Sequence, residues 1–285
     1  MISLAKGERF CYGFRETDSA MIIEKSARIL HKESWGDYHL LSLESATISR
    51  EAQPGQFLMV KVQSQSCPLL RRPFGIHGRG INTVEIFFKV AGSGTALLAG
   101  KKTGETVDML GPLGKGFILE DAAPGKTLWA VAGGRGIAPF KLWAEEVRSR
   151  GSSLKILYGG RTQADLPLAA GFRQAGFDLA CSTDDGSLGF KGFVTGLLET
   201  ELRRTRPDRL YACGPDPMLA AVSRIAIAEN IPCGLSLESQ MGCGFGACWG
   251  CVKKIRRAGS QEWVKVCEEG PVFEAAEIVW ETEKP

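Results

Sequence analysis

The sequence lacks any long hydrophobic run and any apolar leader. No segment approaches the roughly 20 consecutive apolar residues that a membrane-spanning helix needs. The N-terminal stretch MISLAKGERFCYGF is interrupted by charged residues and by Cys11, which is unlike a secretory signal. The formal net charge is only +3, which gives no basis for binding nucleic acid or a membrane surface. We therefore expect a soluble, cytoplasmic protein.

The pattern of apolar residues changes along the chain. Short β-type runs separated by Gly and Pro turns occupy residues 39–45, 56–62, 84–90 and 104–110, which favours an antiparallel barrel or sandwich. After residue 123, strand-like runs alternate with helix-like stretches over residues 138–150, 193–202 and 218–229, as in a parallel α/β sheet. We expect four parts: an extension (residues 1–25), a β-barrel (26–122), an α/β domain (123–232) and a cysteine-rich domain (233–285).

Four of the nine cysteines lie close together near the C-terminus. They form C-x4-C-x2-C and, after fifteen intervening residues, a fourth cysteine; the set is Cys243, Cys248, Cys251 and Cys267. This is the plant-type ferredoxin spacing for a [2Fe–2S] cluster. Glycines in the same loop allow the backbone to approach the sulfurs closely. Structural zinc is the alternative, but zinc sites usually pair two C-x2-C motifs or use histidines, and no histidine follows His77.

Two motifs in the β region suggest a bound flavin. The first is Arg71-Arg72-Pro73-Phe74-Gly75, and the second runs from Lys89-Val90 to Gly94-Thr95. They resemble the ferredoxin–NADP reductase superfamily, which pairs an FAD-binding barrel with a Rossmann-like nicotinamide domain. The resemblance implies that Arg72 contacts the flavin pyrophosphate and that Phe74 lies against the flavin ring. It also implies a phosphate contact at Gly94 and Thr95. Gly75 departs from the Ser or Thr usual in that family.

The orthodox G-x-G-x-x-G dinucleotide fingerprint is absent. In its place stands Gly133-Gly134-Arg135-Gly136-Ile137-Ala138-Pro139 between a strand and a helix, where free N–H groups can hold a pyrophosphate. This motif and Cys213-Gly214-Pro215 also resemble the reductase superfamily. The resemblance places Cys213 beside the nicotinamide and makes it the candidate catalytic residue. Arg161 is a candidate for a 2′-phosphate, and Asp184 or Asp185 for a ribose. We expect NAD rather than NADP.

The motifs together predict an α+β multidomain protein. It consists of an antiparallel FAD-binding β-barrel, a Rossmann-like nicotinamide domain and a small C-terminal [2Fe–2S] loop domain. Across residues 28 to 273 the chain is most similar to the electron-transfer subunits of type B, NAD-dependent dihydroorotate dehydrogenases, notably in TDDGSLGFKGFVT and ESQMGCGFGACWGCV. The resemblance implies a catalytic partner subunit with FMN, a heterotetramer of two plus two subunits, and a role in pyrimidine biosynthesis. No dihydroorotate site is expected on this chain.

Two other functions fit the same motifs. The chain could serve as the diaphorase subunit of a sulfhydrogenase or of a ferredoxin:NADP transhydrogenase, which keeps the chemistry and changes the partner. It could also be a redox-sensing iron–sulfur regulator, for which an inactive nicotinamide site is expected. A structural subunit held together by zinc is the remaining possibility, and it predicts a colourless protein.

Overall fold

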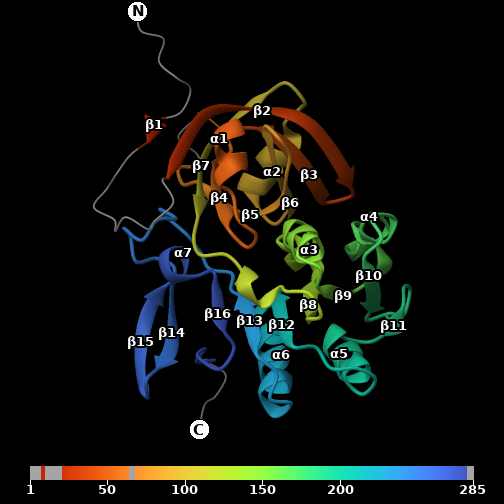
Figure 1. Ribbon diagram of the computed structural model, residues 1–285. Coiled ribbons are helices and arrows are strands. Elements are labelled where there is room, and N and C mark those ends of the chain that lie inside the picture. Colours follow the sequence, from red (N-terminus) through yellow and green to blue (C-terminus); the bar gives the residue numbers. More distant parts are fainter. Residues whose placement is uncertain (1–7, 10–20, 64–67, 281–285) are drawn as a thin grey trace, which may run out of the picture.

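A computed structural model describes residues 8–9, 21–63 and 68–280 (Figure 1). Two sheets of seven strands each and a separate two-stranded hairpin make up the fold. The extension expected over residues 1–25 lies largely outside the described residues. Its last part, from Ile22, belongs to a barrel strand, and β1 (Glu8–Arg9) pairs with the start of that strand.

The N-terminal sheet closes into a six-stranded antiparallel barrel, as predicted. Its strands are β2 (Ile22–Trp35), β3 (Tyr38–Glu44), β4 (Phe57–Lys61), β5 (Arg72–Arg79), β6 (Thr83–Lys89) and β7 (Thr106–Leu113). They follow the order β2-β3-β6-β5-β4-β7, and β7 pairs back onto β2. Two short helices accompany the barrel: α1 (Ala46–Glu51) and α2 (Ser93–Gly100). Closure matters because it removes free strand edges.

Alternation along the strands decides what each face of the barrel contacts. In β4, Leu58 and Val60 point into the barrel core, whereas Phe57 and Met59 belong to a second core outside it. The period of two residues therefore buries both faces of this strand. The second core continues through the cysteine domain and the α/β sheet, so the three parts share one apolar contact zone.

The second sheet is parallel except at one edge. Its strands are β8 (Thr127–Gly133), β9 (Ser153–Gly160), β10 (Asp178–Thr183), β11 (Phe190–Lys191), β12 (Arg209–Cys213), β13 (Cys233–Ser236) and β16 (Val272–Glu274). The order is β11-β10-β9-β8-β12-β13-β16, and only β16 runs antiparallel to its neighbour. The strand order reverses on the two sides of β8, which is where doubly wound sheets bind nucleotides. The predicted Rossmann-like domain is confirmed.

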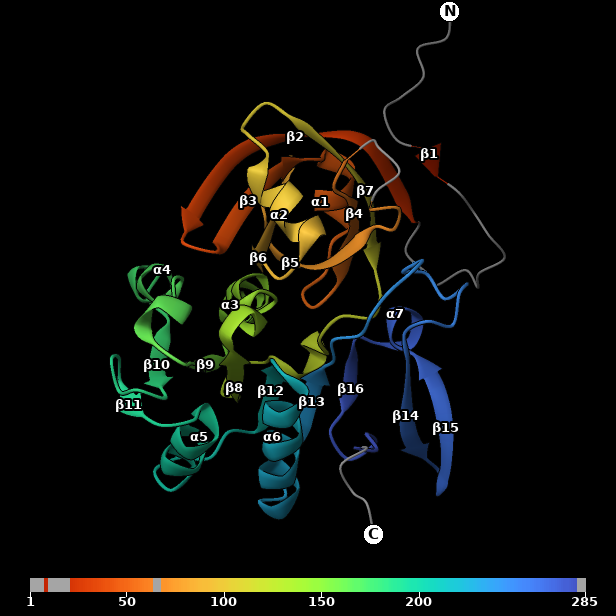
Figure 2. The ribbon, with the colours of Figure 1, turned by 180° about the vertical axis from the view of Figure 1, so that it is seen from behind.

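Helices cover both faces of this sheet (Figures 1 and 2). They are α3 (Phe140–Ser149) and α4 (Ala169–Gln174) on one face, and α5 (Val194–Leu202) and α6 (Asp216–Ala228) on the other. In β8, Leu128, Ala130 and Ala132 pack towards α3, and Trp129 and Val131 pack towards α5 and α6. Because both faces are covered, β8 is a continuous apolar run rather than an alternating one. Short 3-10 turns occur at Leu119–Asp121, Gly134–Ile137 and Gln163–Asp165.

The cysteine-rich part is small and lies against both sheets (Figure 1). It contains a hairpin of β14 (Val252–Arg257) and β15 (Ser260–Lys265), followed by α7 (Val266–Glu269). Its turn contains Ala258 and Gly259, both with positive φ, which matches the twist of a tight hairpin. In the described ranges no helix is long and apolar enough to cross a membrane.

Candidate functional site

A cavity of about 870 Å³ lies where the three parts of the molecule meet. Strand β5 of the barrel contributes Arg72 and Phe74, and the end of β12 contributes Cys213. The segment after β13 contributes Met241, two residues before the first clustered cysteine. The volume and the mixture of aromatic and charged walls suit an organic cofactor of flavin size.

Most of the residues predicted to bind a flavin line this cavity. They are Arg72, Pro73, Phe74, Gly75, Lys89 and Thr95. The predicted Gly94 lies against Arg72 instead, because an added Cβ there would be 2.9 Å from Arg72 Nε. The Thr95 hydroxyl accepts hydrogen bonds from the N–H groups of Ala91 (2.8 Å) and Gly92 (3.1 Å) and so fixes the start of α2. The predicted Val90 is held by a backbone bond to Asp37 (2.8 Å).

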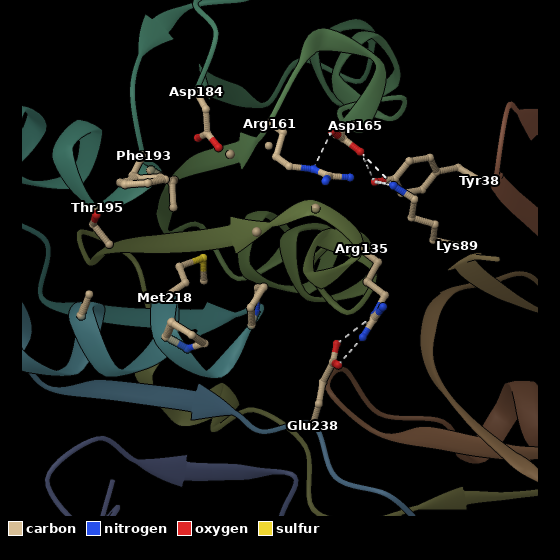
Figure 3. Close-up of a pocket in the computed structure, with 18 residues that line it drawn as sticks. Tyr38, Lys89, Arg135, Arg161, Asp165, Asp184, Phe193, Thr195, Met218 and Glu238 are labelled. Carbon is tan, nitrogen blue, oxygen red and sulfur yellow. Dashed lines mark hydrogen bonds and ion pairs between the residues drawn. The ribbon is translucent and has the colours of Figure 1, made fainter. Parts of the chain in front are cut away.

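A second cavity, of about 640 Å³, adjoins the first and lies over the carboxyl ends of the parallel strands (Figure 3). Of the residues predicted to bind the nicotinamide nucleotide, Gly133, Gly134 and Pro215 line it, as do Arg161 and Asp184. Asp185 instead accepts hydrogen bonds from Ser187. This position at the strand ends is where open α/β sheets take their ligands.

The remaining residues predicted for the nucleotide lie elsewhere. Gly136 allows the loop to approach the Cys213 carbonyl, because an added Cβ would overlap that group. Ile137 is fully buried in the core, and an added Cβ at Gly214 would lie 2.6 Å from Met218 Cε. Ala138 and Pro139 line the flavin-sized cavity. The residues of the motif GGRGIAP therefore lie in three places: at the nucleotide cavity, in the core and at the flavin-sized cavity.

Two polar networks form the barrel side of the nucleotide cavity (Figure 3). In the first, Asp165 accepts hydrogen bonds from the Tyr38 hydroxyl (2.9 Å) and the Lys89 ammonium (3.0 Å). Burial and the hydrogen bond to Asp165 raise the pKa of Tyr38. Burial alone would raise the pKa of Asp165, but the hydrogen bonds from Lys89 and Tyr38 outweigh it and lower that pKa. In the second, Arg135 donates two hydrogen bonds to Glu238, at 3.2 and 2.6 Å.

Cys213 is a protonated thiol at neutral pH. It is 7% exposed, and burial together with the nearby Glu238 carboxylate raises its pKa to about 12. The free thiolate is the reactive form of cysteine, so this side chain is not poised as a nucleophile. Its place at the wall of the flavin-sized cavity fits a role in shaping the contact between flavin and nicotinamide.

The four clustered cysteines lie as two neighbouring pairs. Cys243 influences Cys248, and the Cys267 N–H donates to Cys251 Sγ at 3.4 Å. Hydrogen bonds from the backbone N–H groups of Gly250 and Cys243 lower the pKa of Cys248 to about 7. The Gly246 N–H donates to Cys267 Sγ at 3.1 Å, although burial raises the pKa of Cys267 well above its usual value.

This arrangement fits a two-iron cluster. A [2Fe–2S] cluster is held by four cysteine thiolates, and the two neighbouring thiol pairs would supply them. Amides directed at sulfur suit thiolate ligands. Gly244, at φ +87°, sits directly on Met59 of β4, so the loop packs against the barrel.

Several residues of the site were given no role from the sequence. Tyr38 and Asp165 line the nucleotide cavity and belong to no motif singled out in the sequence. Phe193, Met218 and Glu238 also line it; they lie inside or next to recognised motifs, but no role was predicted for them. Glu238 offered one usable sign, since it closely follows the end of a parallel strand, β13. Carboxyl ends of parallel strands converge on ligand sites, so acidic residues there merit attention.

Known proteins match the cysteine domain and, separately, most of the chain. Residues 238–279 match the family described as the iron-sulfur cluster binding domain of dihydroorotate dehydrogenase B. The dihydroorotate dehydrogenase B (NAD(+)) electron transfer subunit of Desulforamulus reducens is 36% identical over 245 residues, covering 85% of this chain and 93% of that protein. The subunit with the same name from Bacillus caldolyticus is 43% identical over 244 residues, covering 84% and 91%.

Solved structures share the fold. The NADH-dependent reduced ferredoxin-NADP oxidoreductase matches with a TM-score of 0.79 and 27% identity, covering 90% of each chain. A ferredoxin NADP+ reductase from Neisseria gonorrhoeae with bound FAD and NADP matches with a TM-score of 0.61 and 21% identity, covering 72% of this chain and 90% of that one. The second match supports the fold alone.

The barrel, the Rossmann-like sheet and the cysteine domain define a class of protein: an iron–sulfur flavoprotein reductase with the ferredoxin–NADP reductase fold. Within that class, the chain belongs to the family of dihydroorotate dehydrogenase B (NAD(+)) electron transfer subunits. The resemblance predicted from the sequence motifs is confirmed.

Proposed function

We propose that the chain relays electrons from the FMN-containing catalytic subunit of a dihydroorotate dehydrogenase to NAD+, by way of a [2Fe–2S] cluster and FAD. The activity belongs to pyrimidine biosynthesis, and we place it in the cytoplasm. A flavin exchanges two electrons with a nicotinamide and single electrons with an iron–sulfur cluster, which is the chemistry the bound groups would supply.

The observation that carries this proposal is the junction of the two cavities. The flavin-sized cavity reaches Met241, beside the cysteine loop, and on its other side shares residues with the nucleotide cavity. A cofactor held there lies between a cluster and a nicotinamide. The order of the sites therefore matches the order in which the electrons would move.

Residues of this chain would hold each group. Cys243, Cys248, Cys251 and Cys267 would ligate the irons; Arg72 and the turn before α2 would hold the FAD pyrophosphate. Gly133 and Gly134 would face the NAD pyrophosphate. Trp249 is 58% exposed next to the exposed Cys248, so the cluster loop can meet a partner subunit. We place two copies of each subunit in the assembly.

Purification with the catalytic subunit tests the proposal. The complex should contain flavin and iron, and dihydroorotate should drive NADH formation. NADH should also bleach the flavin absorption of the chain alone. An inactive complex with the cognate partner would contradict the choice of substrate, and an unbleached flavin would favour the redox-sensing function.

A transhydrogenase diaphorase is the second candidate, because the structure with a TM-score of 0.79 comes from an NADH-dependent ferredoxin-NADP oxidoreductase. It predicts reduction of NADP+ by NADH together with reduced ferredoxin, with a different partner subunit. Exchange of the partner in one assay separates the two functions, since only the cognate pair should turn over.

A further inference from the structure

Three charged side chains line both cavities: Lys89, Arg135 and Glu238. A nicotinamide that exchanges hydride with a flavin must bring its ring to the point where the two cavities meet, because the reacting atoms must come within about 3–3.5 Å. Lys89 is occupied by Asp165 at 3.0 Å. Glu238 therefore lies beside the place that the nicotinamide ring must occupy.

The charges of the nucleotide cavity balance in the free protein. Its cations are Lys89, Arg135 and Arg161, and its anions are Asp165, Asp184 and Glu238. Lys89 and Arg161 share Asp165, at 3.0 and 3.8 Å, and Arg135 faces Glu238 at 2.6 Å. A dinucleotide adds the two negative charges of its pyrophosphate, so a cation must leave its carboxylate to meet them.

Arg135 is the cation best placed for that exchange. It belongs to the glycine loop between β8 and α3, next to Gly133 and Gly134, whose position at a strand end suits a pyrophosphate. The side chains of Arg135 and Glu238 are 49% and 45% exposed. Exposed ion pairs of this kind contribute little stability, so parting them costs little.

The Glu238 backbone is held in place, and its side chain lies where the two cavities meet. The preceding residue, Leu237, is buried and donates its N–H to the Pro271 carbonyl at 2.9 Å. Figure 3 shows the Glu238 carboxylate directed towards Arg135 at the edge of the cavity, well separated from Asp184 on the far side. A freed Glu238 therefore remains beside the ring.

We infer that Glu238 makes the site prefer the oxidised nicotinamide: Arg135 exchanges Glu238 for the bound pyrophosphate, and the freed carboxylate faces the ring. This inference rests on the proposed function. The nicotinamide ring of NAD+ is cationic and that of NADH is neutral, so the carboxylate attracts only the substrate of NAD+ reduction. Once reduced, the ring loses this attraction, which favours release of the product.

Binding of two ligands to the FAD-loaded protein tests the inference. The ligands are NAD+ and 1,4,5,6-tetrahydro-NAD, whose uncharged ring cannot reduce the flavin, and dissociation constants are measured by calorimetry at fixed ionic strength. Glu238→Gln should weaken NAD+ relative to the tetrahydro compound by about two- to fivefold, the range of one partly screened charge pair. Asp184→Asn is the matched control: it removes a carboxylate from the same cavity and should change both affinities by the same factor.

A second variant tests the exchange itself. Arg135→Gln should weaken both ligands by a similar factor while keeping the preference for NAD+. An equal effect of Glu238→Gln on both ligands, or undiminished binding to Arg135→Gln, would overturn the inference and leave the proposed function standing. If the unmodified protein binds neither ligand, the proposed function itself is wrong, and the inference is overturned with it.

Discussion

At the scale of single residues, Gly75 is the clearest departure from the reductase superfamily. An added Cβ at this position meets nothing within 4 Å, and its φ lies outside the positive region. We expect Gly75→Ser to keep the free energy of unfolding within about 0.5 kcal/mol. Gly75 lines the flavin-sized cavity, so the added hydroxyl should shift the midpoint potential of the flavin in a spectroelectrochemical titration.

Gly75→Ala is the control for that substitution. It adds the same Cβ without a hydroxyl and should leave the potential close to that of the unmodified protein. Equal potentials for the Ser variant and the unmodified protein would show that the hydroxyl has no influence at this position.

His77 gives a prediction for the pH dependence of stability. It is 2% exposed, its Nδ1–H donates to the Ala138 carbonyl at 2.8 Å, and burial lowers its pKa to about 4. In the unfolded chain the imidazole becomes protonated as the pH falls below about 6.5. In the folded protein it stays neutral until the pH falls to about 4. The free energy of unfolding should therefore fall as the pH is lowered between these values, by up to about 3 kcal/mol.

Urea titrations across this pH range would measure the effect. His77→Asn can still donate to Ala138 but does not titrate, so its unfolding free energy should vary less with pH by that amount. A profile unchanged in His77→Asn would contradict the assignment.

At the scale of elements, the cysteine loop should be separable from the nicotinamide site. Cys267 is 2% exposed, lies in α7 and lines neither of the two cavities. Cys267→Ser should abolish the EPR signal of the reduced cluster and the partner-coupled turnover. Reduction of FAD by NADH should persist at close to the original rate, because Gly133, Gly134 and Cys213 are untouched.

Cys233→Ser supplies the comparison for the loop variant. Cys233 is a buried cysteine of β13 that lies outside the loop. Its variant should retain the EPR signal of the cluster. Simultaneous loss of cluster and flavin reduction in Cys267→Ser would mean that the loop supports the whole fold.

Most elements were predictable, because each depends on local sequence. The strand Asp178–Thr183 and the hairpin from Val252 to Lys265 follow from apolar runs and turn residues. Helix α4 (Ala169–Gln174) was not predicted, since it has only six residues and too few turns to show a period. Strand β2 was only partly predicted: it has 14 residues, with a register shift in each of its pairings and many exposed positions.

At the scale of the whole molecule, Asp165 links the barrel to the parallel sheet of the Rossmann-like domain. It accepts from Tyr38 of β3 and Lys89 of β6, and the lysine and aspartate side chains are only 25% and 14% exposed. Asp165→Asn removes the shared charge, and we expect the free energy of unfolding to fall by about 1–3 kcal/mol. Chemical denaturation would measure the change.

Glu44→Gln is the matched control for this prediction. It breaks the Arg28–Glu44 pair, whose side chains are 58% and 48% exposed. The cost should stay below about 1 kcal/mol, because exposed pairs are screened by water. Equal costs for the two variants would show that Asp165 is no stronger a link than a surface ion pair.

The sequence by itself determined the chemistry of each part of this protein. The spacing of Cys243, Cys248, Cys251 and Cys267, the RRPF strand and the glycine loop at Gly133 are short-range patterns, and each specifies a local backbone geometry. The tertiary structure alone decided how these parts meet. Tyr38 lies 127 positions from Asp165, and Arg135 lies 103 positions from Glu238. Neither partner carries a local signal for the other, because such pairs form only after closure of the barrel and winding of the sheet bring their ends to one cavity.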